Sequence, residues 1–216
     1  MNKGRLIVID GIDGSGKTTQ IELLKQVLAS QGVPLQIISF PRYEDNEYGK
    51  LVKRYLEGEF GSINEVDPRK MACLFAGDRL LAKPIIEKWL AEGKLVICNR
   101  YVSASKAHMG ANLPKEKRAE FFKWLDVLEY ETNAIPKEDL TILLTVDPEV
   151  GQKNVLGRHP DLHEDNLKHL EEANKIYLEL SGMEPNWEVI NCIENGQMRS
   201  KEAIHQDIMQ ILSKIS

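Results

Sequence analysis

The stretch that decides the fold is RLIVIDGIDGSGKTTQ, residues 5–20. It opens with a short apolar run, residues 6–9, and continues with GIDGSGKT, which fits the pattern of a glycine, any four residues and then Gly-Lys-Thr at every defined position. A glycine-rich loop between a buried strand and a helix lets backbone N–H groups and the helix N-terminus hold phosphate oxygens. We therefore expect a nucleoside triphosphate site formed by Gly11, Ile12, Asp13, Gly14, Ser15, Gly16, Lys17, Thr18 and Thr19.

Two side chains of this loop have the chemistry of phosphoryl transfer. The ammonium group of Lys17 is placed to neutralise the β- and γ-phosphates. The hydroxyl of Thr18 is placed to ligate Mg²⁺, which bridges the same two phosphates during transfer. The loop thus predicts where the phosphate is held, but it does not predict which molecule accepts it.

Four further apolar runs follow along the chain, and helical patterns separate them. The runs have little polar alternation, as is typical of strands buried on both faces of a parallel sheet, and they span residues 35–40, 95–98, 140–146 and 187–190. This alternation predicts an α/β fold, a doubly wound five-stranded parallel sheet flanked by helices, with ligands outside the carboxyl ends of the strands. With 216 residues and 42% hydrophobic content, we expect one domain over residues 1–216.

Composition excludes several other classes of protein. The formal net charge of -5 argues against a nucleic-acid binder, whose affinity comes from a basic surface, so we expect no nucleic-acid partner. No apolar run approaches the length of a membrane span, so we expect no membrane partner. The three cysteines are far apart and lack metal-type spacing, which favours small core residues in a reducing compartment. We expect a soluble, cytoplasmic protein.

Three segments supply arginines to the expected ligand edge of the sheet. They are FPRY at residues 40–43, LFAGDR at residues 74–79 and NRYVSASKAHMG at residues 99–110. Each arginine alone is more often a surface ion pair than a ligand. Together they predict a polar cleft suited to a monophosphate and to charge developing on a transferred phosphoryl group, and the arginines are Arg42, Arg79 and Arg100.

The order and approximate spacing of GIDGSGKTT, FPRY, LFAGDR and NRY resemble the thymidylate kinase family of P-loop nucleoside monophosphate kinases. The resemblance covers nearly the whole chain, because DLHEDNLKHLEEANKIYLEL, residues 161–180, resembles the region that follows the family's lid. It implies ATP-dependent phosphorylation of dTMP to dTDP with Mg²⁺. It also implies a short lid near residues 156–164 and a homodimer formed through the helices of residues 67–89.

The resemblance also implies roles for individual acceptor-site residues. Asp13 resembles the carboxylate that meets the 3′-hydroxyl of the deoxyribose. Arg42 and Arg100 resemble the groups on either side of the acceptor phosphate, Phe75 the ring that stacks on thymine and Arg79 the arginine that reads the base. The other substrate-binding residues expected are Phe40, Tyr43, Ser105, His108, Met109 and Tyr177.

Among these, His108 stands where the family has an aromatic residue that crowds the 2′ position, and Tyr177 resembles a tyrosine lying over the nucleoside. Arg158 is the candidate for an arginine that acts on the transition state, alongside Lys17 and Arg100 as catalytic residues. Asn99 replaces the aspartate with which the family's segment usually begins. A neutral amide can bond a water on Mg²⁺ but adds no negative charge, so we expect Asn99 to contact the metal through water.

Two other functions remain open from the residues alone. A deoxynucleoside kinase must activate a neutral 5′-hydroxyl, which calls for a carboxylate near the end of the second strand. FPRY places Arg42 there, although Glu44 and Asp45 are close in sequence. A nucleotide-dependent switch without enzymatic activity would need the triphosphate site but no acceptor pocket, and the set of Phe75, Arg79 and Arg100 argues against that reading.

Overall fold

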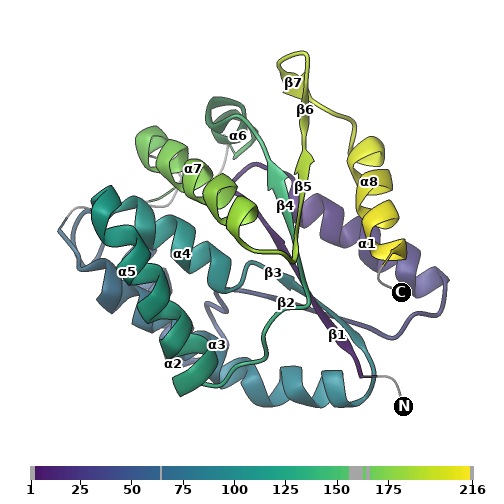
Figure 1. The fold of residues 1–216 in the computed structure, drawn as a ribbon, viewed down its shortest axis with the longest axis horizontal. Helices are drawn as coiled ribbons and strands as arrows, with labels where there is room; N and C mark the ends of the chain where they lie inside the picture. Colours follow the sequence, from purple (N-terminus) through teal and green to yellow (C-terminus); the bar gives the residue numbers. More distant parts are fainter. Residues whose placement is uncertain (1–2, 64, 156–162, 164–165, 215–216) are drawn as a thin grey trace.

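A computed structural model describes residues 3–63, 65–155, 163 and 166–214. At its centre is a five-stranded sheet in the order β2-β3-β1-β4-β5, in which every neighbouring pair is parallel (Figure 1). The strands are β1 (Arg5–Asp10), β2 (Leu35–Ser39), β3 (Leu95–Asn99), β4 (Leu140–Thr145) and β5 (Trp187–Asn191). The predicted doubly wound five-stranded parallel sheet is confirmed.

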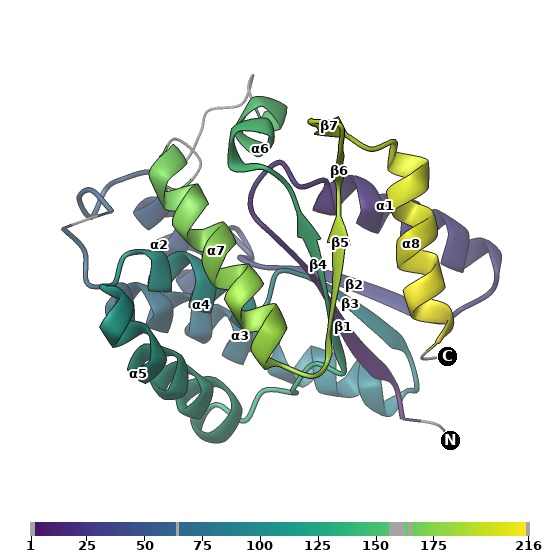
Figure 2. The same ribbon diagram turned by 45° about the horizontal axis from the view of Figure 1, so that its top comes forward.

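Helices cover both faces of the sheet. One face carries α1 (Lys17–Ser30) and α8 (Lys201–Ser213), which lie side by side in both ribbon views (Figures 1 and 2). The other face carries α2 (Glu47–Leu56), α3 (Pro68–Ala91), α4 (Val102–Ala111), α5 (Lys115–Asp126) and α7 (Leu167–Met183). The short α6 (Pro148–Val155) lies at the carboxyl end of the sheet.

Strand β1 shows why the sheet must be covered on both sides. Side chains of a strand alternate between its faces, and here both sets are apolar. Leu6 and Val8 pack into the cluster under α2, α3 and α4, whereas Ile7 and Ile9 pack into the cluster under α1 and α8. All four are at most 1% exposed, so β1 is the centre of both cores.

The two helices on the first face form as the apolar spacing predicts. In α1 the buried side chains include Ile21, Leu24 and Leu28, and the helix stops before Gly32, whose φ of 72° lies in the left-handed region. In α8 the buried side chains include those of Ile204, Ile208 and Ile211. Ile215, which belongs to the same predicted stripe, lies outside the described residues.

Two features were not predicted. A small antiparallel hairpin of β6 (Ile193–Glu194) and β7 (Gln197–Met198) extends beyond β5, and its turn residues Asn195 and Gly196 have φ of 52° and 75°. A π-helical turn, η1 (Val127–Thr132), continues α5. Of the lid predicted near residues 156–164, only His163 lies within the described residues. None of the helices described is long and apolar enough to span a bilayer.

Helix α6 packs directly on the backbone of the glycine loop. A Cβ atom on Gly14 would lie 2.0 Å from the carbonyl oxygen of Gly151, and a Cβ on Gly151 would lie 2.7 Å from that of Asp13. In addition, Asn154 Nδ2 donates to the carbonyl oxygen of Gly14 over 3.0 Å. The position of α6 therefore requires glycine on both sides of this contact.

Gly14→Ala should destabilise the fold more than Gly32→Ala, because the two glycines have nearly the same φ, 75° and 72°, but only Gly14 has a close neighbour. We expect Gly32→Ala to lower the free energy of unfolding by about 1–2 kcal/mol through its left-handed backbone. Gly14→Ala should lose roughly a further 1–3 kcal/mol through overpacking against α6. Urea denaturation of both variants measures the difference, and equal losses would contradict the close packing of α6 on the loop.

Candidate active site

The glycine loop, residues 11–16, connects the end of β1 to the start of α1. Gly11, Gly14 and Gly16 have φ of 140°, 75° and 93°, values that other residues rarely adopt. Gly16 is the N-cap of α1, and no side chain caps the N–H groups in the first turn of this helix.

A cleft of about 470 Å³ lies at this loop and helix start. It is lined by Asp13, Gly14, Gly16, Lys17, Thr18, Thr19, Asn99, Arg100, Asn154 and Met198.

The side chain of Lys17, which is expected to neutralise bound phosphates, is held against the glycine loop. Its Nζ donates to the carbonyl oxygens of Gly11 and Ile12 over 2.9 and 2.8 Å. The side chain is only 7% exposed. A positive charge is therefore held on the inner side of the glycine loop, where the loop's own carbonyls orient it.

A second cavity, of about 110 Å³, lies between the carboxyl ends of β1, β2 and β3 and helices α2, α3 and α4. Most of the predicted acceptor-site residues line it. They are Asp13, Phe40, Tyr43, Phe75, Arg79, Arg100, Ser105, His108 and Met109, and the other lining residues are Pro41, Leu56, Tyr101, Ala104 and His163. Arg42 and Tyr177 were predicted with them and are not part of this lining.

Arg100 and Asp13 belong to the linings of both cavities. Arg100 Nη2 donates to Asp13 Oδ1 over 2.6 Å. The backbone of Arg100 is in the left-handed region, with φ of 65°, and its N–H donates to the carbonyl oxygen of Ile9. Burial alone would raise the pKa of Asp13, but the charges of Arg100 and Lys17 outweigh it and lower that pKa to about 2. Asp13 is therefore ionised at neutral pH.

Arg79 is held from three sides and is 2% exposed. Its Nε donates to Glu129 Oε1 over 2.9 Å, and its Nη2 donates to the same oxygen and to Ser105 Oγ, the latter over 2.8 Å. Its Nη1 donates to the carbonyl oxygen of Tyr101 over 3.2 Å. Burial alone would lower the pKa of Arg79, but Glu129 raises it above the usual range. A guanidinium has five N–H groups, so among the described residues these four bonds leave one N–H of Nη1 without a partner, and a ligand can accept from it.

Arg42 follows β2 and pairs with Asp78 of α3. Its Nε donates to Asp78 Oδ1 over 2.9 Å, and its Nη2 donates to the carbonyl oxygen of Asp78 over 2.7 Å. Asn46 Nδ2 also donates to Asp78 Oδ1. These bonds fix one edge of the Arg42 guanidinium, and no bond to its Nη1 is made within the described part of the chain.

Tyr177 contacts Asp10, the last residue of β1 before the glycine loop. Its hydroxyl donates to Asp10 Oδ1 over 2.6 Å, and burial raises its pKa well above the usual range. Asp10 Oδ1 also accepts from the N–H of Gly11, and Asp10 Oδ2 accepts from Ser103 Oγ. Asp10 thus ties α7 and α4 to the start of the loop. The predicted place of Tyr177 over the nucleoside stays a prediction.

The residues predicted to hold a metal lie together in the first cleft. Thr18 and Asn99 both line it. Asn99 Oδ1 is buried and has no hydrogen-bond partner among the described residues. An amide oxygen and a threonine hydroxyl that line one cleft are a suitable donor set for Mg²⁺, which prefers oxygen ligands and keeps several waters. Arg158, the predicted transition-state arginine, lies outside the described residues.

Sequence reasoning missed several residues on which the site depends. Asp78 and Asp10 could have been found from the sequence, because Asp78 stands next to Arg79 in LFAGDR and Asp10 is a lone carboxylate at the end of a buried strand. Glu129 in η1 could not, because its pairing with Arg79 joins residues 50 positions apart. His163 and His169 were likewise not singled out, although both approach His108 at the cavity wall.

Comparison with known proteins identifies relatives over almost the whole chain. A sequence model of the family described as thymidylate kinase matches residues 9–208. A probable thymidylate kinase of Pyrococcus horikoshii is 33% identical over 214 residues, which are 97% of this chain and 96% of that protein. The thymidylate kinase of Mycobacterium tuberculosis is 30% identical over 196 residues, which are 87% of this chain and 91% of that protein.

The solved structures agree on the fold. A thymidylate kinase structure from Candida albicans superposes with a TM-score of 0.79 at 22% identity and covers 98% of this chain and 92% of that chain. With the P-loop, the adjoining acceptor cavity and these relatives together, the chain belongs to the thymidylate kinase family, whose reaction is the phosphorylation of dTMP to dTDP.

Proposed function

We propose that this chain transfers the γ-phosphoryl group of ATP to dTMP at the junction of the two cavities. The observation that supports this most directly is that the phosphate cleft and the acceptor cavity share two lining residues, Asp13 and Arg100. A donor in one cavity and an acceptor in the other therefore meet at one guanidinium. Holding both reactants in line is the main part of catalysis in this class of reaction.

On the donor side, the glycine loop and the start of α1 bind the triphosphate. Lys17 turns from the loop carbonyls to the β- and γ-phosphates. Thr18 and Asn99 would hold Mg²⁺, Asn99 through water, and the ion would supply charge neutralisation on the triphosphate. Asn99 Oδ1, which has no partner in the part of the chain that the structure describes, supports this assignment, because a buried amide oxygen without a partner is otherwise unfavourable.

On the acceptor side, the phosphate of dTMP lies between Arg42 and Arg100. Its oxygen is already anionic at neutral pH, so no general base is needed, only alignment and charge stabilisation. Asp78 holds Arg42 by one edge of its guanidinium and leaves Nη1 for the phosphate. Arg158 acts on the transition state in this proposal, from the predicted lid.

The nucleoside occupies the second cavity. Phe75 stacks on thymine and Arg79 meets its O4, because the two side chains come from α3 and line the same cavity. Asp13, ionised, accepts from the 3′-hydroxyl, and His108 lies beside the ribose. Ser105 orients Arg79 through its hydroxyl, which accepts from Nη2.

A deoxynucleoside kinase is less well supported. The carboxylates near the end of β2, Glu44 and Asp45, are exposed and outside the lining of the cavity. Glu44 is paired with Lys53 over 2.7 Å on the surface. A switch without enzymatic activity is also less well supported, because it would not need the acceptor cavity.

The same proposal includes the number of domains, the oligomeric state and the location of the chain. The chain works as one domain and as a homodimer, and the exposed face of α3 forms the subunit contact. Leu80 and Leu81 on that face are 38% and 51% exposed. A reducing, cytoplasmic location fits three cysteines that are all free thiols.

Lys17→Ala should slow phosphoryl transfer strongly and leave the fold intact, because it removes a charge needed in the transition state. We expect kcat to fall by roughly 10²- to 10³-fold. Lys25→Ala is the matched control, since Lys25 is exposed on the same helix. ADP release with Mg-ATP and dTMP measures turnover, and circular dichroism checks folding. Turnover at the wild-type rate by Lys17→Ala would exclude the assigned role.

The base should be selected in the order dTMP, then dUMP, then dCMP. Arg79 has one N–H left and can only donate, so it pairs with O4 of thymine or uracil and meets another donor in the amino group of cytosine. We expect dCMP to lose a factor of roughly 10⁴ in kcat/KM, and dUMP, which lacks only the 5-methyl group, about 10- to 200-fold.

Steady-state kinetics over a panel of monophosphates tests this order, and equal use of dCMP or of a purine monophosphate would show the base assignment to be wrong. Arg79→Ala should narrow the gap between dTMP and dCMP chiefly by weakening dTMP. Because that variant leaves Glu129 buried without its partner, it should also lose roughly 3–5 kcal/mol of stability. Its folding is therefore measured alongside its kinetics.

Leu81→Glu should convert a dimer into a monomer, because a buried carboxylate without a partner disfavours association. The wild type should then have twice the chain mass of 24.5 kDa by light scattering. Leu178→Glu is the matched control, since Leu178 is 46% exposed on α7, away from α3. A monomeric wild type, or equal behaviour of the two variants, would contradict the α3 contact.

A further inference from the structure

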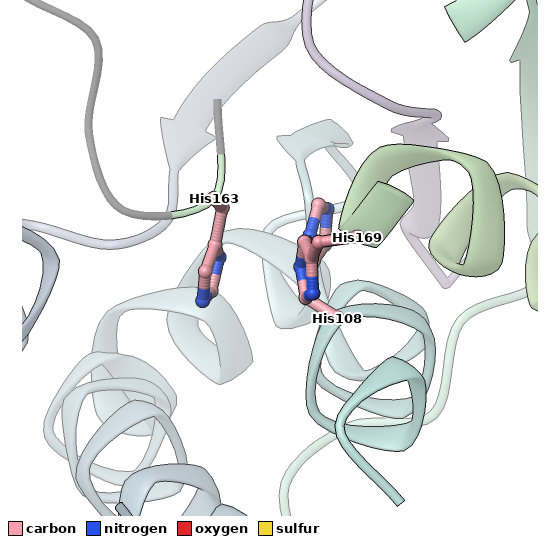
Figure 3. A group of neighbouring side chains, drawn as sticks. All are labelled: His108, His163 and His169. Carbon is pink, nitrogen blue, oxygen red and sulfur yellow. The ribbon is translucent and has the colours of Figure 1, made fainter. Parts of the chain in front are cut away.

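Three histidines from separate segments lie close together (Figure 3), and two of them, His108 and His163, line the acceptor cavity. His108 comes from α4, His169 from α7, and His163 from between α6 and α7. They are 5%, 6% and 5% exposed. One ring nitrogen of each can be chosen so that all three atoms lie within 4.8 Å of one another.

The pair of His108 and His169 already has the spacing of two metal ligands. His108 Nδ1 and His169 Nε2 are 3.3 Å apart. In a tetrahedral zinc site with Zn–N distances of about 2.0–2.1 Å, two ligand nitrogens are about 3.3–3.4 Å apart. The two atoms therefore need not move apart to admit an ion, but the ion lies off the line that joins them, so each ring has to tilt toward it.

The third ring is close but has to turn. His163 is stacked on His108 with centroids 5.2 Å apart and an interplanar angle of 7°, and it lies 4.6 Å from His169. Lone pairs of stacked rings point along parallel planes, so a rotation of His163 is needed to aim a nitrogen at the other two. Its Nε2 is 3.0 Å from the hydroxyl of Tyr55, and that hydroxyl can support the ring from outside the ion's first ligand sphere.

Hydrogen bonds fix which nitrogens are protonated without an ion. Arg100 Nη1 can only donate, so His108 Nε2, at 3.0 Å, accepts. In a neutral ring the proton of His108 is then on Nδ1, which donates to His169 Nε2. His169 in turn donates from Nδ1 to Asn112 Oδ1 over 3.0 Å. Asn112 thereby aims the lone pair of His169 Nε2 at the position between the rings.

The electrostatic surroundings keep the cluster neutral and available for an ion. Burial lowers the pKa of His108 and His163 well below the usual range and that of His169 to about 4. An incoming cation thus has no imidazolium charge to displace at pH 7. The ionised Asp13 favours a cation here, whereas Arg100 and Lys17 oppose it.

We propose that His108, His163 and His169 form a site for one zinc-like divalent transition-metal ion, whose occupation competes with the acceptor nucleotide. Three imidazoles suit zinc, copper or nickel rather than Mg²⁺, which requires oxygen ligands. Three protein ligands leave a fourth position for water. Because His108 and His163 line the acceptor cavity, an ion on them occupies space next to the nucleotide.

The ion also changes the position of Arg100. It takes the place of the proton that His108 Nδ1 donates to His169. In a ring that stays neutral, this single proton has to move through solvent to Nε2, which faces the N–H of Arg100. Two donors cannot bond each other, so metal binding and the Arg100–His108 hydrogen bond exclude one another.

Binding is tested on the full chain after dialysis against EDTA, with Co²⁺ as a spectroscopic probe and Zn²⁺ as its competitor. We expect one Co²⁺ per chain, with the visible absorption of a site with fewer than six ligands, which Zn²⁺ abolishes. His163→Gln and His169→Gln should each weaken binding by at least about 10- to 100-fold, and Asn112→Ala by a similar factor through the orientation of His169.

His205→Gln is the matched control, because His205 lies on α8, on the opposite face of the sheet. It should bind Co²⁺ like the wild type, and thermal melts should show that all variants fold. Absence of saturable Co²⁺ and Zn²⁺ binding would overturn the proposal. Binding that is unchanged in both His163→Gln and His169→Gln would do so as well.

The competition is measured in the absence of ATP, so that kinase turnover plays no part. Saturating dTMP should weaken Co²⁺ binding by at least about fivefold. This step rests on the proposed acceptor site, so dTMP binding to the metal-free chain is measured first by calorimetry. If dTMP does not bind there, the acceptor site is wrong and the metal site stands on its own titration. If dTMP binds and Co²⁺ affinity does not change, the competition is wrong.

Discussion

The pairing of each cleft arginine with a carboxylate of the same chain is the constraint on which the rest of the site depends. A buried guanidinium without a partner is unfavourable by several kcal/mol, so a site built to bind phosphate must hold its own cations before the phosphate arrives. The chain does this with partners from α3, η1 and the glycine loop. The three pairs are Arg42–Asp78, Arg79–Glu129 and Arg100–Asp13.

The three pairs differ in burial, and this difference separates their roles. Arg79 and Glu129 are 2% and 0% exposed, so their pair is part of the core and fixes the direction of the one N–H that remains. Arg42 and Arg100 are 14% and 15% exposed, so water and ligand reach them. A permanently paired arginine suits recognition of a neutral base. A partly exposed one suits a phosphate, which brings its own negative charge and takes over hydrogen bonds from the carboxylate.

The sequence was sufficient for the fold, and most of the predicted site residues line the two cavities, because those features are local. The glycine loop, the five apolar runs and the stripe of Ile204, Ile208 and Ile211 each follow from short-range spacing. The partners of the arginines are not local, and nothing in a run of residues predicts that Glu129 lies against Arg79. Nor does spacing predict that the hydroxyl of Tyr177 is used by Asp10, 167 positions away. Such contacts depend on how α3, α4 and α7 pack on one face of the sheet.

Arg100 is both paired with a carboxylate and placed by long-range contacts, and it lines both cavities. A long flexible side chain aligns two phosphates poorly unless its rotamer freedom is restricted. In Arg100 the restriction begins with the backbone conformation. The left-handed φ of 65° is unfavourable for arginine, and the hydrogen bond from its N–H to Ile9 at the end of β1 helps to hold it. Asp13 and His108 then fix the guanidinium at Nη2 and Nη1. The direction of this charge is therefore set by the central strand of the sheet, which also positions the glycine loop, so in the proposed reaction one rigid element aligns donor and acceptor.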